Sequence, residues 1–70
     1  MRLKENQREI LQRLVDGASQ KEIGVAMGIH QKTVNAHLSA ACTRVGARST
    51  CQLVAMAVAG GVVECHVEHE

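Results

Sequence analysis

Short polar and basic side chains recur near the middle of the chain, at a spacing that suits recognition of a nucleic acid. They lie opposite the apolar positions of a helical pattern and are Gln31, Lys32, Asn35 and Ser39. Amide, hydroxyl and ammonium groups form hydrogen bonds with base edges, and a major groove admits one helix. These residues therefore predict hydrogen-bonding contacts to a duplex, with base contacts from Gln31 and Asn35 among them.

The residues around this stretch predict two helices that would position it. Ser19 and Glu22 have the spacing of a capping box, which starts a helix, and Gly28 can adopt the left-handed conformation that ends one. Gly24 is small enough for a second helix to cross closely. The core-facing positions expected of the two helices are Ile23, Ala26 and Met27, followed by Val34, Leu38, Ala41 and Val45. Two short helices joined at a glycine are typical of a helix-turn-helix.

Two further helices complete an all-α fold. The four predicted helices span residues 3–15, 20–27, 31–45 and 50–59, and glycines follow the first, third and fourth of them. Proline, phenylalanine, tyrosine and tryptophan are absent, so the core is expected to be aliphatic. Residues 1–63 are predicted to form one domain, onto which Val62 and Val63 fold back, and residues 64–70 a flexible acidic tail.

Composition restricts the function without deciding it. The 70 residues carry a formal net charge of +1, but residues 1–59 have a balance of +4 and residues 60–70 one of −3. This suits a DNA-binding module, and it equally suits an ordinary mixed surface. Because no apolar run of membrane-spanning length and no signal peptide is present, we expect a soluble intracellular protein without membrane contact. The three cysteines are expected to remain reduced.

Metal binding and catalysis are not predicted. The segment near the C-terminus holds four potential metal ligands, Cys65, His66, Glu68 and His69. Structural zinc sites draw ligands from two separated segments, and no second cluster is present, so no metal and no cofactor is expected. The sequence offers no set of nucleophile, base and orienting residue, and a short aliphatic helical chain encloses little space for a pocket. We therefore expect that the protein is not an enzyme.

The predicted helix over residues 50–59 is apolar on almost every side. Its core stripe is satisfied by Leu53, Val54 and Ala57, which leaves a second apolar face without a partner within the chain. The residues of this second face that we expect to form a homodimer interface are Cys51, Ala55, Val58 and Ala59. The alternative is scattered exposure of small side chains, which is common in soluble proteins.

Read end to end, the chain resembles the DNA-binding domain of the LuxR/GerE family, the module that also ends NarL- and FixJ-type response regulators. The matching positions extend over about sixty residues and include Glu9-Ile10-Leu11, Lys21-Glu22-Ile23, Gly28-Ile29, Lys32-Thr33-Val34, His37, Gly46 and Ser49. The resemblance implies a four-helix bundle whose third helix enters the major groove and whose fourth commonly forms the dimer contact. His30 stands where the family usually has a serine N-cap, which is expected to weaken that cap.

Residue roles follow from the resemblance position by position. The sites that resemble base-reading positions are Asn35, Ala36 and Ser39, and those that resemble phosphate or sugar contacts are Lys21, Lys32, Thr33 and His37. An asparagine can make two hydrogen bonds to adenine, and an alanine methyl can touch the methyl group of thymine. Arg44 and Arg48 would add charge-assisted phosphate contacts. His37 is interpreted either as such a contact or as a packed neutral histidine.

These observations predict a sequence-specific transcription regulator that binds double-stranded DNA as a homodimer, with half-sites about one helical turn (~10 bp) apart. The resemblance implies a cytoplasmic protein, located in the bacterial cytoplasm or nucleoid. Since no input domain is visible, we expect a stand-alone regulator of the kind that a phage or mobile element encodes. The alternative is a small protein-interaction module that pairs with a host transcription factor through helix 49–59. The low net charge and the apolar last helix are the features that motivate this alternative.

Overall fold

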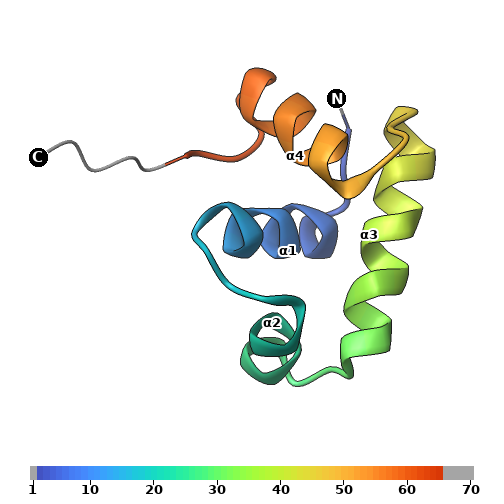
Figure 1. Ribbon diagram of the computed structural model, residues 1–70. Helices are drawn as coiled ribbons and strands as arrows, with labels where there is room; N and C mark the ends of the chain where they lie inside the picture. Colours follow the sequence, from blue (N-terminus) through green and yellow to red (C-terminus); the bar gives the residue numbers. More distant parts are fainter. Residues whose placement is uncertain (1, 66–70) are drawn as a thin grey trace, which may run out of the picture.

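Four α-helices make up the fold, as Figure 1 shows for this computed structural model, which describes residues 2–65. The helices are α1 (Glu5–Val15), α2 (Gln20–Met27), α3 (Gln31–Val45) and α4 (Thr50–Ala59). In Figure 1, α1 lies between α2 and α4, and α3 passes the N-terminal end of α1. The described residues contain no strand, so the predicted all-α, four-helix class is confirmed. None of their helices is long and apolar enough to cross a bilayer.

The capping box predicted at the start of α2 is present. The Ser19 side chain accepts a hydrogen bond from the backbone N–H of Glu22 (3.1 Å), and the Glu22 carboxylate accepts one from the backbone N–H of Ser19 (2.9 Å). The backbone N–H of Ser19, and then its side-chain hydroxyl, favour the ionised carboxylate of Glu22, so they lower the pKa of Glu22. Gly28 ends α2 in the left-handed conformation, with φ at 70°. Both ends of this helix therefore lie where the sequence predicts them.

The first helix begins two residues later than expected, at Glu5 instead of Leu3. Lys4 is extended (φ −68°, ψ 156°), and its backbone N–H donates to the Gln7 side-chain carbonyl over 3.0 Å. Gln7 is only 4% exposed, and it is the one buried polar residue among those the structure describes. Its amide satisfies a backbone donor at the helix end, which explains why a polar side chain is tolerated there.

Aliphatic side chains from all four helices form one core. Its buried residues are Ile10, Leu11, Ile23, Val34, Leu38, Ala41, Leu53, Ala57 and Val63. Met27 and Val45 are partly buried against this cluster, as their positions predict. Ala26 is exposed, so its predicted place on the core face is wrong. The buried residues of this eight-residue helix are Ile23 and Gly24, so Ala26 lies off the face that packs against the core.

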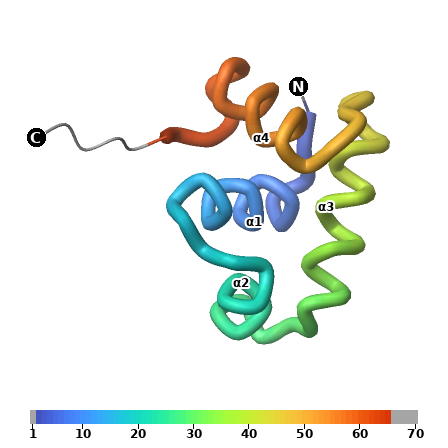
Figure 2. The backbone as a smooth tube through the Cα atoms, viewed as in Figure 1, coloured from blue at the N-terminus to red at the C-terminus, as the bar shows by residue number. Residues whose placement is uncertain are grey.

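The chain beyond α4 returns to α1, as the tube in Figure 2 shows. Val63 is buried and Val62 packs against the core, in agreement with the prediction that both fold back. The side-chain amide of Gln12 then pairs with the backbone of Glu64 twice. Gln12 Nε2 donates to the Glu64 carbonyl over 2.8 Å, and the Glu64 N–H donates to Gln12 Oε1 over 2.9 Å. Glu64, predicted to begin the flexible tail, is thus bound to α1, whereas residues 66–70 of that tail lie outside the described part.

Candidate nucleic-acid interface

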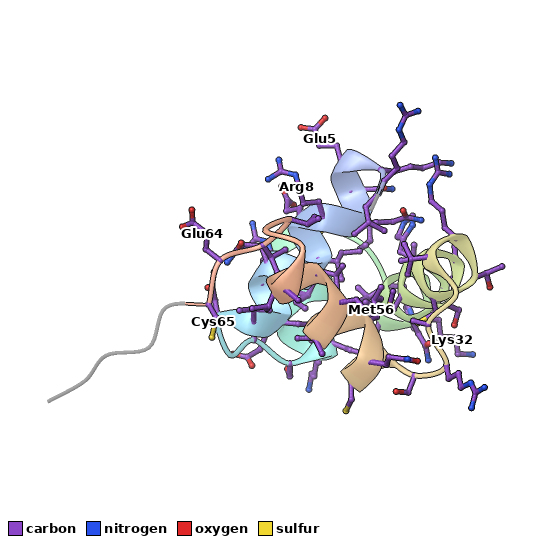
Figure 3. The ribbon with its side chains drawn as sticks, turned by 90° about the horizontal axis from the view of Figure 1, so that it is seen from above. Glu5, Arg8, Lys32, Met56, Glu64 and Cys65 are labelled. Carbon is purple, nitrogen blue, oxygen red and sulfur yellow. The ribbon has the colours of Figure 1, made fainter. Side chains whose placement is uncertain are left out.

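The side of α3 that faces away from the bundle is open to solvent. Val34, Leu38 and Ala41 point into the core, which leaves the opposite side of this fifteen-residue helix uncovered. The four predicted base-contacting residues, Gln31, Asn35, Ala36 and Ser39, are all exposed. Figure 3 shows Lys32 on the same helix, at the edge of the molecule opposite Arg8 of α1. The chain itself therefore leaves this polar face accessible to a partner.

The N-terminus of α3 is held by a histidine instead of the usual serine. His30 Nδ1 accepts a hydrogen bond from the backbone N–H of Lys32 over 3.1 Å, and the His30 carbonyl accepts from the N–H of Thr33 and of Val34. One of the unpaired donors at the helix start is thereby satisfied by an imidazole nitrogen. The substitution at this position thus keeps a side-chain cap on the helix that carries the candidate interface.

Close packing at Gly24 fixes how α3 follows α2. A Cβ added there would lie 2.7 Å from the Ile29 carbonyl oxygen and 3.4 Å from the Gln31 nitrogen. The Ile29 N–H also donates to the Gly24 carbonyl over 2.9 Å. The small residue is needed, as predicted, because the turn and the first residue of α3 approach it closely. Its nearest neighbour is the backbone of the turn between the two helices.

The two long flanks of α3 have different neighbours. On the side toward α2, a shallow hollow is lined by Gln20, His30, Gln31, Lys32 and Asn35. On the side toward the start of α1, the Asn6 side-chain nitrogen lies 3.5 Å from His37 Nδ1. Further along this side, Arg44 Nε donates to the backbone carbonyl of Arg2 over 3.0 Å. The N-terminal segment and α1 thus border the interface together with the helix-turn-helix.

The residues predicted to contact phosphates do not form one cluster. Lys32 and Thr33 lie in the first turn of α3, whereas Arg44 lies in its last turn and Arg48 in the turn that follows. These four side chains are exposed, as is Lys21 in the first turn of α2. His37 is half-buried against α1, which combines the two interpretations given for it: a packed ring that still reaches the surface. This spread suits a long ligand better than a small anion.

The predicted dimer face on α4 is uncovered in the single chain. Cys51, Ala55 and Ala59 are exposed, and 37% of Val58 is exposed. Leu53 and Ala57 are fully buried on the other side of the helix. These residues are accessible to a partner, and their role as a dimer interface stays a prediction. The same is true of each base and phosphate contact predicted above.

The predicted absence of a metal site concerns residues that lie mostly outside the described part. Cys65 is exposed, while His66, Glu68 and His69 fall beyond it. Within residues 2–65, no three Cys, His, Asp or Glu side chains are grouped as metal ligands. The cysteines at 42, 51 and 65 are all free thiols.

Sequence reasoning missed the residues that border the interface through single hydrogen bonds. Arg2 and Asn6 carry no periodic signal, because each acts through one contact to α3. Gln7 and Gln12 were also missed, since an amide that bonds to backbone resembles any surface glutamine in the sequence.

Comparison with known proteins places these features in a family context. Residues 1–57 match the profile of the bacterial regulatory proteins of the luxR family. A transcriptional regulatory protein from Thauera aromatica, TdiR, is 38% identical over 58 residues, which are 83% of this chain. The chain spans 26% of the length of that relative.

Proposed function

The chain belongs to the luxR family of bacterial regulatory proteins, and from this premise we propose that it binds double-stranded DNA and regulates transcription. In this proposal α3 enters a major groove and reads bases through Gln31, Asn35, Ala36 and Ser39. The observation that supports it most is the open polar face of α3, exposed next to a rigidly capped turn. The name of the relative TdiR, a transcriptional regulatory protein, agrees with this activity.

The groove assignment is tested by separating contacts to phosphates from contacts to bases. Lys32→Ala is expected to weaken binding to all sequences. It should also make the negative slope of log K against log salt concentration shallower by about 0.9. Asn35→Ala is expected to reduce the preference for one base pair by about 1–3 kcal/mol with little change of that slope. Fluorescence anisotropy with duplexes selected from a random library measures both quantities. If both variants bind like the parent, the groove assignment is wrong.

We further propose that two copies bind together through α4, so that each α3 reads one half-site about 10 bp from the other. The support is the exposed apolar face formed by Cys51, Ala55, Val58 and Ala59, which no part of residues 2–65 covers. Val58→Glu would bring a charge into this contact and is expected to give a monomer in sedimentation velocity. Gln52→Glu adds the same charge elsewhere on α4 and serves as the control. A parent protein that stays monomeric on operator DNA contradicts the dimer.

A second candidate function is supported by the same face. Through α4 the chain would pair with another transcription factor of this fold and prevent that factor from dimerising. The exposed apolar α4 favours this proposal, because a small domain gains little from leaving such a face in water. An electrophoretic shift at low and at moderate salt distinguishes the two. Binding to DNA on its own favours the first function, and failure to bind at low salt favours the second.

A further inference from the structure

Two arginine residues lie together at the edge of the bundle, where the N-terminal segment passes the end of α3. Arg2 and Arg44 line a shallow hollow together with Val45 and Met56. Both arginines are exposed, while Val45 and Met56 are partly buried. Figure 3 shows Met56 between α4 and α3, so the apolar part of the hollow lies where these two helices meet. No acidic side chain is among the residues that line it.

A hydrogen bond fixes the direction of one of these guanidinium groups. Arg44 Nε donates to the Arg2 carbonyl over 3.0 Å, so the bond uses the inner nitrogen of the fork and leaves both Nη groups as outward donors. A carbonyl does not neutralise the positive charge. The same bond holds the backbone of Arg2 in place, which brings the second cationic side chain to the hollow. Two cations beside apolar atoms, with no carboxylate in the lining, make a site for an anion, and guanidinium groups bind phosphate oxygens in pairs.

The hollow continues one flank of the candidate interface. Thr33, His37 and Arg44 are four and seven residues apart, so they follow one side of α3 along its length. The start of the chain borders this side at two points, through Asn6 beside His37 and Arg2 beside Arg44. With α3 in a major groove, one strand of the DNA would run along this flank. The phosphates of that strand would reach the hollow.

We propose that Arg2 and Arg44 together bind one phosphate of the DNA backbone, and that Arg2 thereby belongs to the interface. This inference rests on the proposed function. Arg44 also has a positioning role, because its bond to the Arg2 carbonyl orders the segment that carries the first cation. Arg2 uses two separate groups, its carbonyl toward Arg44 and its guanidinium toward the phosphate.

The test compares Arg2→Gln, Arg44→Gln and the double variant in binding to a selected duplex over a range of salt concentrations. Arg2→Gln keeps the carbonyl, so the bond from Arg44 and the fold are preserved. Arg2→Gln is expected to weaken binding about tenfold. The double variant is expected to lower the salt slope by about 0.9 in total, since both side chains bind the same phosphate. Arg8→Gln removes an equal charge from α1, on the side of the molecule away from Lys32, and should change neither quantity.

The outcomes separate this proposal from the function on which it rests. If Lys32→Ala weakens binding as expected while Arg2→Gln behaves like Arg8→Gln, the phosphate contact is wrong and the DNA-binding function stands. If the parent protein binds no duplex, the function itself fails. A titration with inorganic phosphate, followed by the NMR signal of the Arg44 Nε–H, gives the remaining comparison. Saturation at low phosphate concentration, together with an unchanged salt slope in the double variant, would assign the hollow to a small anion and overturn the proposal.

Discussion

The most direct test of how the turn positions α3 is the substitution Gly24→Ala. The added Cβ would lie 2.7 Å from the Ile29 carbonyl oxygen and within 3.4 Å and 3.6 Å of backbone atoms of Gln31 and His30. All three neighbours are backbone, so none can rotate away. Moving the turn would also strain the bond of the Ile29 N–H to the Gly24 carbonyl. We therefore expect α3 to shift relative to α2.

Two opposing effects set the magnitude. Overpacking of a tight site costs about 1–3 kcal/mol, while alanine is favoured over glycine inside a helix by about 1 kcal/mol. The free energy of unfolding is thus expected to fall by up to about 2 kcal/mol, and the melting temperature by about 4–8 °C for each kcal/mol lost. Because the chain has no tryptophan or tyrosine, urea unfolding is followed by far-UV circular dichroism.

Ala26→Gly is the matched control for Gly24→Ala. Ala26 is exposed in the same helix, so this change isolates helix propensity and should cost about 1 kcal/mol. The displaced α3 should also make Gly24→Ala weaker in operator binding than Ala26→Gly at equal folded fraction. A Gly24→Ala variant that is more stable than the parent by about 1 kcal/mol would show that propensity alone operates there, and would refute the close contact.

Three further predictions concern single hydrogen bonds. Gln12→Ala removes two bonds to the backbone of Glu64, which should cost about 1–2 kcal/mol and speed amide exchange at Glu64; unchanged exchange would contradict this. His30→Ala removes the cap of α3 and should cost about 0.5–2 kcal/mol in urea unfolding, while His30→Ser should restore it; equal losses in both would contradict the cap. The bonds from Ser19 lower the pKa of Glu22, so its contribution to stability is present at neutral pH and is lost as pH falls through that lowered value. Glu22→Gln should therefore flatten the acid side of the stability profile, and an unaltered profile would exclude this linkage.

The helix ends that sequence could predict are those with a local chemical signal. Ser19 and Glu22 form their reciprocal bonds within four residues, and Gly28 and Gly46 adopt left-handed backbone because their own type allows it. The start of α1 was wrong by two residues, since it depends on how the amide of Gln7 turns back to the chain. Such a bond follows from three-dimensional packing and leaves no periodic pattern.

The candidate site also has a part that the sequence could predict and a part that it could not. The exposed face of α3 was predictable because Val34, Leu38 and Ala41 mark the opposite side by their spacing. The second border of the site was not, because the contacts of Arg2 and Asn6 to α3 join residues 42 and 31 positions apart. Pairings over such separations depend on how α1 lies against α3, which a pattern within one helix does not contain.

The short connection between α3 and α4 has a mechanical consequence for any paired assembly. Only residues 46–49 separate the two helices; Gly46 ends the first, and the Ser49 side chain accepts from the backbone N–H of Gln52 at the start of the second. Leu38 and Ala41 of α3 share one core with Leu53 and Ala57 of α4, so we expect the two helices to move as one unit. A dimer built on α4 would then hold its two α3 helices at a nearly constant separation. An operator with one base pair inserted between its half-sites would have to be untwisted to match this separation. The DNA, and not the protein, would then be deformed.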